Sequence, residues 1–447
     1  MLSLHKRQST STKQLDSVAE TVRGGWTGEY LVLAERLGGA TDTLLAEIAS
    51  AGGTTIGVIA ANSGPATIGP GVPTIVLAEQ TPMSRAGFAA ALREPPGLLQ
   101  DWIEEIDPSA EAPVVATNFV ELDSVCGRRV LGRRPVRWSA YEDKTVIDEL
   151  FARADVPTPA YEVVDVAPQL IADAYRRIRG RDGAVLALDS STDFRGDANG
   201  LRWLGSDLSA DGLMEASAWA EGLAARVRVS EFVEGVPCSV LAIAGPDGVA
   251  AFDPIEIVTL RDSVSRELVF IGSSTFWRPA GPLNAEIRDA ALRVGALLQA
   301  DAGYRGFFSI DGVVTAAGFV ATELNPRLAS GLGLREARPD FPIYLLSRSL
   351  GDGTLPVGML DIERFASEAR TAIRATPSVS LTIPADRLRR LPDPDAPREA
   401  DRFAPRIRGV HPSGEALRGV DGLVGPRVAA LAVELGWQTA QSFGTPK

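Results

Sequence analysis

The side chains best suited to chemistry lie in one stretch, residues 304–331. Asp311 is followed twelve residues later by Glu323, and the string Glu-Leu-Asn-Pro-Arg then adds Asn325 and Arg327. Glu323 and Asn325 stand at i and i+2, so they would share one face of an extended strand. Mg²⁺ takes oxygen ligands of this kind and leaves its other positions to water and phosphate. The planar, charged fork of Arg suits a phosphoryl group. The stretch therefore predicts a site for magnesium and a nucleotide.

Two strands must position these side chains. Residues 307–310 form an apolar run that we expect to be a strand ending at Asp311-Gly312, and residues 318–324 look like its partner in a β-hairpin. Pro326 ends the second strand, because it lacks the N–H that a sheet needs. An apolar stripe at helical spacing over residues 287–298 predicts the preceding helix. The alternative is a structural hairpin whose acid and amide satisfy turn backbone and whose Arg is solvated.

The run GYRGFFSIDGVVTAAGFVATELNPR resembles the closing segment of the ATP-grasp superfamily. In that superfamily, Asp, Glu and Asn hold magnesium and an Arg contacts phosphate. The resemblance implies that Asp311, Glu323 and Asn325 are metal ligands and that Arg327 contacts phosphate or a reaction intermediate. It also implies that the cofactors are ATP and Mg²⁺.

A single interior lysine is the second candidate. The chain has 45 Lys and Arg residues, yet Lys144 is its only Lys outside the termini. A compact ammonium retained among arginines suggests a need for a point charge. Lys144 would lie in the first turn of a helix over residues 142–154, where a cation is disfavoured unless an anion joins it. The run from Tyr141 to Val164 resembles the Lys–helix–proline opening of the superfamily, which implies that Lys144 binds ATP. An ion pair with Asp148 at i+4 is the alternative.

The run RVSEFVEGVPCSVLAI resembles the hinge that recognises adenine in this superfamily. An extended segment offers N–H and C=O groups to a purine edge, so Glu231, Phe232 and Val233 are candidates through their main chain. Glu234 is a candidate for a ribose contact. The same run also fits an ordinary strand, Gly turn and strand.

Two features depart from the family pattern. The strand expected over residues 184–188 carries no cation where relatives have a second Lys, and Pro237 and Cys238 replace an acid expected after the hinge. The segment DSSTDFRGDANG would be a phosphate flap, closing through backbone N–H groups, or else a disordered polar loop. Its candidate nucleotide contacts are Ser190, Ser191, Thr192 and Arg195.

Three further arginines are candidates for binding the carboxylate substrate or the tetrahedral intermediate. They are Arg261, Arg278 and Arg305. The alternative for each is an ordinary surface ion pair.

Composition narrows the classes of protein. A net charge of −12 and a pI near 4.9 argue against nucleic-acid binding. Two cysteines, Cys126 and Cys238, supply neither a disulfide framework nor a zinc site, and two histidines, His5 and His411, make His-based catalysis a poor expectation. The sequence has no apolar leader or membrane-spanning run, so we expect a cytoplasmic protein without a membrane partner.

At 447 residues the chain should form several domains. Short strands alternate with helices in the first part, which predicts a small α/β domain. The expected fold is α/β with α+β subdomains: an ATP-grasp fold with a preceding α/β domain and a C-terminal extension. The expected divisions are 1–139 for the preceding domain, 140–355 for the ATP-grasp domain (140–228 and 229–355), and 356–447 for a C-terminal domain that serves the acceptor substrate.

The resemblance implies an ATP-dependent carboxylate–amine ligase that forms an acyl phosphate and then an amide, with ADP and phosphate released. Its partners would be a small-molecule carboxylate and an amine or peptide acceptor. The layout is most similar to the pheganomycin-type peptide ligases of actinobacterial antibiotic biosynthesis. A degenerate ATP-binding regulator and a kinase-like phosphotransferase remain open. The oligomeric state is also open, with a homodimer among the options.

Overall fold

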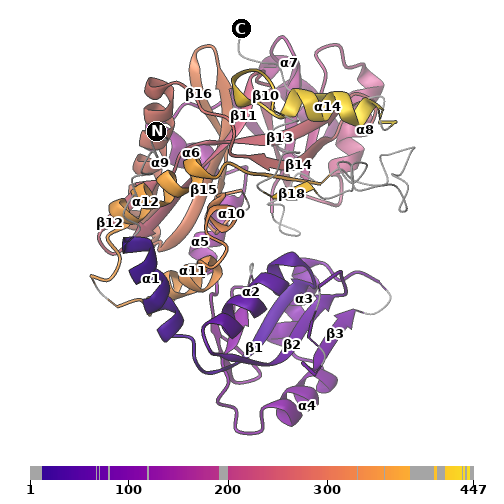
Figure 1. Cartoon of the computed structure of the whole chain (residues 1–447). Helices are drawn as coiled ribbons and strands as arrows, with labels where there is room; N and C mark the ends of the chain where they lie inside the picture. Colours follow the sequence, from indigo (N-terminus) through magenta and orange to yellow (C-terminus); the bar gives the residue numbers. More distant parts are fainter. Residues whose placement is uncertain are drawn as a thin grey trace, which may run out of the picture.

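The computed structural model describes residues 13–66, 68–69, 71–78, 81–117, 120–190, 200–329, 331–356, 358–382, 407–409, 418–434, 436–437 and 440–442. Within these residues the chain forms three sheets, each covered by helices (Figure 1). No helix among them is long and apolar enough to cross a membrane.

The first sheet belongs to an N-terminal α/β domain, as the alternating pattern predicted. Its strand order is β3-β2-β1-β4-β6-β5, and all pairs are parallel except β5 with β6. The central strand is apolar on both faces because helices cover both, and Leu31, Val32 and Leu33 are fully buried. The strands are β1 (Glu29–Arg36), β2 (Thr54–Asn62), β3 (Thr74–Ala78), β4 (Val114–Ala116), β5 (Ser124–Val125) and β6 (Arg128–Leu131), and the helices are α2 (Gly39–Ser50), α3 (Arg85–Arg93) and α4 (Gly97–Ile106).

A connecting segment leads from this domain into the second sheet. It contains α5 (Val136–Ser139), a 3₁₀ turn (Ala140–Glu142) and α6 (Ile147–Arg153). The helix expected over residues 142–154 is therefore shorter than predicted, and Lys144 lies in the turn that precedes it. This turn is held by Asp143, whose carboxylate accepts hydrogen bonds from the N–H and hydroxyl of Thr145.

The second sheet is antiparallel, in the order β7-β10-β8-β9. Alternation along β10 sets its two faces: Val227 and Val229 are buried against the helices, while Arg228 and Ser230 point to the opposite side. The elements are β7 (Tyr161–Asp165), α7 (Pro168–Ile178), β8 (Ala184–Leu188), β9 (Leu201–Leu204), α8 (Ala210–Ala220) and β10 (Arg226–Glu231).

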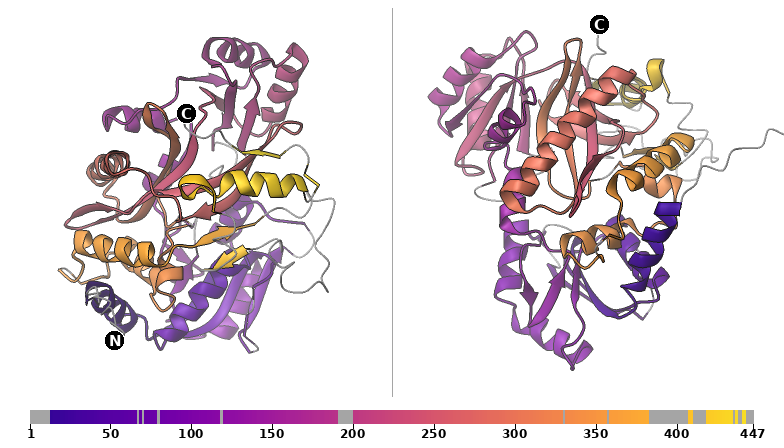
Figure 2. Two further views of the ribbon diagram at one scale, coloured as in Figure 1. Left: turned by 45° about the horizontal axis from the view of Figure 1, so that its top comes forward. Right: turned by 90° about the vertical axis from the view of Figure 1, so that its left-hand side faces the viewer.

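The third sheet is the largest. Its main path is β16-β15-β11-β13-β14-β17-β18, with β12 on β11 and β19 on β13. The long helix α9 (Gly281–Ala302) runs along one face of this sheet (Figure 2). Gly303 ends α9 with a φ of 60°, a conformation that glycine adopts without strain. The strands are β11 (Val236–Gly245), β12 (Gly248–Ala251), β13 (Ile255–Asp262), β14 (Leu268–Ser274), β15 (Gly306–Thr315), β16 (Gly318–Asn325), β17 (Val379–Leu381), β18 (Ile407–Gly409) and β19 (Ala440–Ser442).

The remaining helices fasten the ends of the chain to the sheets. α1 (Lys13–Gly24) packs against α11 (Ile343–Gly351) and α12 (Ile362–Ala375), and α10 (Leu334–Ala337) packs on α12. α14 (Gly425–Glu434) lies on β13, where the buried Glu256 accepts hydrogen bonds from the N–H groups of Val424 and Gly425. The described parts of the C-terminal segment thus add strands and a helix to the third sheet. The divisions at residues 139, 228 and 355 stay our interpretation of the sequence, and β10 crosses the second of them.

The predicted hairpin is formed by β15 and β16, but its first strand is longer than expected. β15 continues past Asp311-Gly312 to Thr315, and opposite these two residues β16 has one extra residue, Thr322, at a β-bulge. A β-carbon at Gly312 would stand 2.4 Å from the carbonyl oxygen of Val320. Glycine therefore lets the strand pass this point without ending, so the Asp-Gly pair, which resembles a turn in sequence, marks a bulge instead.

Candidate nucleotide and metal site

A cavity of about 360 Å³ lies between the second and third sheets. The second sheet contributes Arg228 and Ser230 together with the small Ala187, and the third contributes the predicted metal ligands. The connection between the two sheets passes along one end of the cavity through Glu231, Phe232 and Val233. Many of the remaining lining side chains are apolar, among them Pro159, Val185, Leu201, Ile255, Ile257, Leu268 and Phe270.

The acidic side of the cavity is built by the hairpin. Asp311 and Glu323 are cross-strand partners, so their side chains start from adjacent points on β15 and β16. Asn325 follows on β16 and donates from Nδ2 to Asp311 Oδ2 at 3.1 Å. Lys144 reaches the same place, with its Nζ 3.2 Å from Glu323 Oε1. The four residues predicted from separate motifs therefore form one cluster.

Burial is the largest influence on the pKa of Asp311. Its surroundings and the neighbouring Glu323 raise its pKa, because both disfavour a second negative charge there. Ser239 opposes the shift by donating from Oγ to Asp311 Oδ1 at 2.5 Å. Lys144 and Arg327 oppose it through their charges. An acidic pair held this way would be stabilised further by a divalent cation.

The side chains here offer the kind of ligand atom that magnesium prefers, oxygen. Two carboxylates and one amide are hard oxygen donors, and phosphate and water would complete six positions. Within the described residues no group of three or more His, Cys, Asp or Glu side chains could hold a metal, so a cation here would need the amide and the nucleotide as further ligands. The Asn325 amide now turns its oxygen to Arg327 Nη2, at 3.0 Å. It must rotate before that oxygen can bind a cation.

Arg327 is fixed by a carboxylate that the motif analysis did not select. Its Nε donates to Glu142 Oε1 at 2.7 Å, and the other oxygen of Glu142 pairs with Arg134. Burial alone would lower the pKa of Arg327, but the charge of Glu142 and its hydrogen bond raise it. The Glu142 side chain is fully buried. The guanidinium is thus a permanent cation aimed into the cavity beside Asn325.

Arg228 is a cation that the sequence analysis missed. It is 3% exposed and lines the cavity. Its Nε and Nη2 donate to the two oxygens of Asp148, each at 2.6 Å, and its guanidinium lies over the Tyr161 ring. Asp148 is therefore paired with Arg228, whereas Lys144 is paired with Glu323, so the alternative of a Lys144–Asp148 ion pair is not seen.

Arg228 also lies where the family pattern lacked a charge. On β10 it is the cross-strand neighbour of Ala187 on β8, the strand on which a second Lys was expected. Its Nη1 has no hydrogen-bond partner among the described residues. The sequence holds little signal for this arginine, because Arg228 simply alternates with Val227 and Val229, as a polar residue on the other face of a strand does. Only the three-dimensional structure shows that this face is buried and lines the cavity.

The hinge residues differ in what their backbones can offer. The N–H of Glu231 donates to the Ala160 carbonyl at 2.8 Å, and that of Phe232 to the Gly183 carbonyl at 3.1 Å. Within the described residues Val233 has no backbone hydrogen bond. The expected main-chain contact to a purine is thus best placed at Val233.

The structure does not place Glu234 or Arg261 in the cavity lining. They form an ion pair with each other, and the Arg261 guanidinium lies 5.0 Å from the Trp203 ring centre and 5.3 Å from that of Phe232. This arrangement links the second and third sheets beside the hinge.

The other predicted contacts are dispersed. Arg278 donates to the backbone carbonyls of Thr275 and Trp277 and does not line the cavity. Arg305 lines a space of about 40 Å³ that also borders Arg327. Ser190 donates its N–H to Asp143 Oδ2 at 3.1 Å and lines a different cavity. Ser191, Thr192 and Arg195 lie outside the described residues.

No family model matches the chain, and no curated protein matches it. Solved structures do. The ADP complex of purK, N5-carboxyaminoimidazole ribonucleotide synthetase, is 15% identical with a TM-score of 0.52, over 80% of this chain and 82% of that one. N5-carboxyaminoimidazole synthase from Aspergillus clavatus, with ADP and 5-aminoimidazole ribonucleotide, is 15% identical with a TM-score of 0.52, over 84% and 85%.

A third similar structure is the biotin carboxylase domain of the Hydrogenobacter thermophilus 2-oxoglutarate carboxylase, in complex with MgADP, ADP and bicarbonate. It is 13% identical with a TM-score of 0.54, over 79% of this chain and 74% of that one. These enzymes have the ATP-grasp fold. The chain therefore has an ATP-grasp fold, with an α/β domain before it and a further segment after it, as the sequence predicted.

Proposed function

We propose that the protein is an ADP-forming carboxylate–amine ligase that uses ATP and Mg²⁺. The observation that carries this proposal is the convergence of Lys144, Arg228 and Arg327 on a cavity that also holds the Asp311–Glu323 pair. Three cations facing two carboxylates suit a triphosphate bound through a divalent ion. The similar structures were solved with ADP or MgADP, which supports the same nucleotide here.

Each residue has a defined part in this proposal. Asp311, Glu323 and Asn325 would hold magnesium, which supplies neutralisation of phosphate charge when bound. Lys144 would move from Glu323 to a phosphate oxygen, and Arg228 would direct its Nη1 to another. Arg327, held by Glu142, would lie beside the transferred phosphoryl group. Val233 would offer its backbone to the base.

The reaction then requires no nucleophilic side chain. A substrate carboxylate attacks the γ-phosphate of ATP and gives an acyl phosphate and ADP. An amine attacks the acyl carbon, phosphate leaves, and the amine loses a proton. The narrower proposal, that a modified amino acid is joined to a peptide N-terminus in actinobacterial antibiotic biosynthesis by a cytoplasmic enzyme, is supported by the sequence resemblance alone.

A second candidate function is nucleotide binding without turnover. The observation in its favour is Ala187, which leaves β8 without the expected cation on its cavity face. In that case Arg228 would serve only as the partner of Asp148. A ligase would form an amide, whereas a protein that only binds the nucleotide would not, so detection of the amide distinguishes the two.

The test is incubation of the protein with ATP, Mg²⁺, a pool of carboxylates and a pool of amines, followed by mass spectrometry. We expect a new amide together with equal amounts of ADP and phosphate. A stable phosphorylated product instead would indicate a kinase, and nucleotide binding without any product would indicate a regulator. Glu323→Gln should lower ADP formation about 10²–10³-fold, the usual cost of losing one group that stabilises transition-state charge.

The matched control is Glu105→Gln, which makes the same change on the exposed surface of α4. It should leave ADP formation unchanged. If Glu323→Gln were as active as this control, the metal site would not be where we place it.

A further inference from the structure

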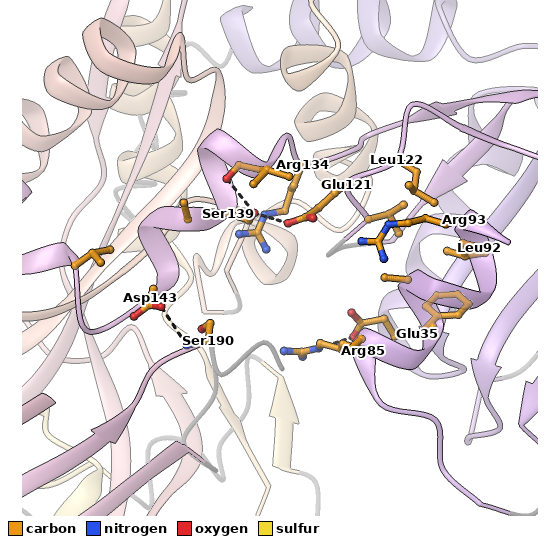
Figure 3. A pocket seen from close by; sticks show the side chains of 17 residues that line it. Glu35, Arg85, Leu92, Arg93, Glu121, Leu122, Arg134, Ser139, Asp143 and Ser190 are labelled. Carbon is orange, nitrogen blue, oxygen red and sulfur yellow. Dashed lines mark hydrogen bonds and ion pairs between the residues drawn. The ribbon is translucent and has the colours of Figure 1, made fainter. Parts of the chain in front are cut away.

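A second cavity, of about 490 Å³, lies between the N-terminal domain and the segment that carries Lys144 (Figure 3). One side is formed by α3, and the other by the chain from Arg134 to Val146 together with Ser190. Its volume is in the range of small-molecule sites. None of the predicted metal ligands lines it, so it is separate from the nucleotide cavity.

Apolar side chains remain uncovered in this cavity. Val136 is 63% exposed and Val146 is 45% exposed, and both belong to the few large apolar side chains with high exposure among the described residues. On the opposite side, the half-buried Leu122 adds apolar surface, and Phe88 and Leu92 of α3, each 3% exposed, back the wall. A ligand with an apolar group would remove this surface from water.

Three charged side chains in the cavity have no ion-pair partner among the described residues: Arg93, Glu121 and Asp143. The Asp143 carboxylate is already occupied by hydrogen bonds from Thr145 and from the N–H of Ser190, which leaves Arg93 and Glu121 as the pair of opposite charges open to a ligand. Arg93 projects into the cavity from the end of α3, and Glu121 lies across from it, held by a hydrogen bond from Ser139 (Figure 3). The other two cations are matched, because Arg85 pairs with Glu35 and Arg134 pairs with Glu142. Arg93 and Glu121 do not pair with each other, so the space between them can accept a ligand that carries both charges.

We propose that this cavity binds a zwitterion with an apolar side chain, an amino acid or short peptide. Its carboxylate would meet Arg93, its ammonium would meet Glu121, and its side chain would cover Val136 and Val146. Bidentate contact with Arg and a charge-assisted hydrogen bond to Glu suit these two groups. The proposal rests on the proposed ligase function in that this molecule would be one of the two compounds joined.

A buried ion network connects the two cavities. Arg134 lines the second cavity and Arg327 lines the nucleotide cavity, and Glu142 pairs with both. A substrate in the second cavity would therefore lie beside Arg134, which Glu142 links to Arg327 of the nucleotide cavity. A link of this kind suits a ligase, which must bring a substrate to an activated partner.

The test is calorimetric titration of the full chain with L-leucyl-L-leucine, with and without Mg²⁺ and a nonhydrolysable ATP analogue. We expect saturable binding that Arg93→Gln and Glu121→Gln each weaken at least about tenfold, the usual effect of one charge-assisted hydrogen bond. Glycyl-glycine should bind more weakly than leucyl-leucine. Arg129→Gln and Glu105→Gln are the matched controls, since both lie on the surface of the same domain outside the cavity.

Capped peptides show which end of the dipeptide each of the two residues binds. N-acetyl-leucyl-leucine should no longer respond to Glu121→Gln, and leucyl-leucine amide should no longer respond to Arg93→Gln. No binding under either condition, equal binding of the two dipeptides, or variants that bind as the wild type does would each overturn the proposal.

Nucleotide binding is measured separately on the same protein, so the two proposals can fail independently. If MgADP binds and leucyl-leucine does not, only the assignment of the second cavity is wrong. If leucyl-leucine binds as expected and no nucleotide binds, the ligase proposal is wrong, while the cavity remains a site for zwitterions.

Discussion

The cations that line the nucleotide cavity and the Arg93 and Glu121 side chains of the second cavity differ in whether the protein pairs them. In the nucleotide cavity, Lys144, Arg228 and Arg327 are each paired with a carboxylate of the protein. In the second cavity, Arg93 and Glu121 have no such partner among the described residues. Buried charges need partners for the chain to fold, whereas charges near water do not. We therefore expect changes at Lys144, Arg228 or Arg327 to affect stability and binding together, and changes at Arg93 or Glu121 to affect binding alone.

The largest effect should follow from Glu142→Gln. This change leaves Arg134 and Arg327 without their shared, fully buried anion. Removing one member of a buried ion pair costs about 3–5 kcal/mol of folding free energy. We expect a lower midpoint in denaturant unfolding and loss of ADP formation. A variant with wild-type stability would show that these arginines do not depend on Glu142.

Arg228→Met should be next in size. It leaves Asp148 buried and unpaired, so we expect a loss of up to about 3–5 kcal/mol of stability and at least about tenfold weaker binding of MgADP. The double variant Arg228→Met, Asp148→Leu removes both charges and should recover most of the stability. Denaturant unfolding and calorimetric titration measure the two properties.

The double variant separates the two roles of Arg228. If it recovers nucleotide binding along with stability, Arg228 acts only as the partner of Asp148 and does not substitute for the missing Lys. If binding stays weak in a stable protein, Arg228 contacts the nucleotide directly.

The parts of the site that could be predicted from the sequence are those formed by residues close together in the chain. Asp311, Glu323 and Asn325 lie within 15 residues on one hairpin, so strand periodicity was enough to bring them together. The pairs that fix the cations join distant segments: Arg228 and Asp148 are 80 residues apart, and Arg327 and Glu142 are 185 apart. No local pattern encodes such a contact.

The fold itself was predictable where hydrophobic periodicity was long. The alternation of strands and helices in the N-terminal domain and the central part of α9 were expected, because these elements bury continuous apolar faces. The helix α9 itself extends beyond the predicted stripe over residues 287–298 at both ends. The end of β15 was misplaced, since Asp311-Gly312 has the composition of a turn, whereas its strand conformation comes from pairing with β16, where Val320 approaches Gly312 too closely for any residue with a β-carbon. Tertiary contact overrode the local signal.

A smaller effect should appear at Glu256, a buried acid whose partners are backbone N–H groups of the α14 start rather than a cation. Burial raises its pKa to about 7. Because the folded pKa lies above the unfolded one, its contribution to stability is present below about pH 4.5 and is lost as pH rises towards 7. We expect Glu256→Gln to gain stability relative to the wild type over this range.

The gain should be on the order of 1–3 kcal/mol between pH 5 and pH 8, since each unit of pKa shift corresponds to about 1.4 kcal/mol. Thermal unfolding at a series of pH values measures it. A wild type that becomes more stable than Glu256→Gln as pH rises would contradict this sign and would mean that the helix N-terminus more than offsets the cost of burying the charge.

The smallest effect on folding should come from Arg93→Gln and Glu121→Gln. Neither side chain loses an ion pair with a described residue, so each unfolding midpoint should stay within about 2 °C of the wild type. Both variants should still bind MgADP normally, because neither residue lines the nucleotide cavity. A large loss of stability in either variant would mean that these charges are structural, and the contrast between the two cavities would disappear. Unchanged folding combined with weakened dipeptide binding is the result that only a ligand-binding role explains.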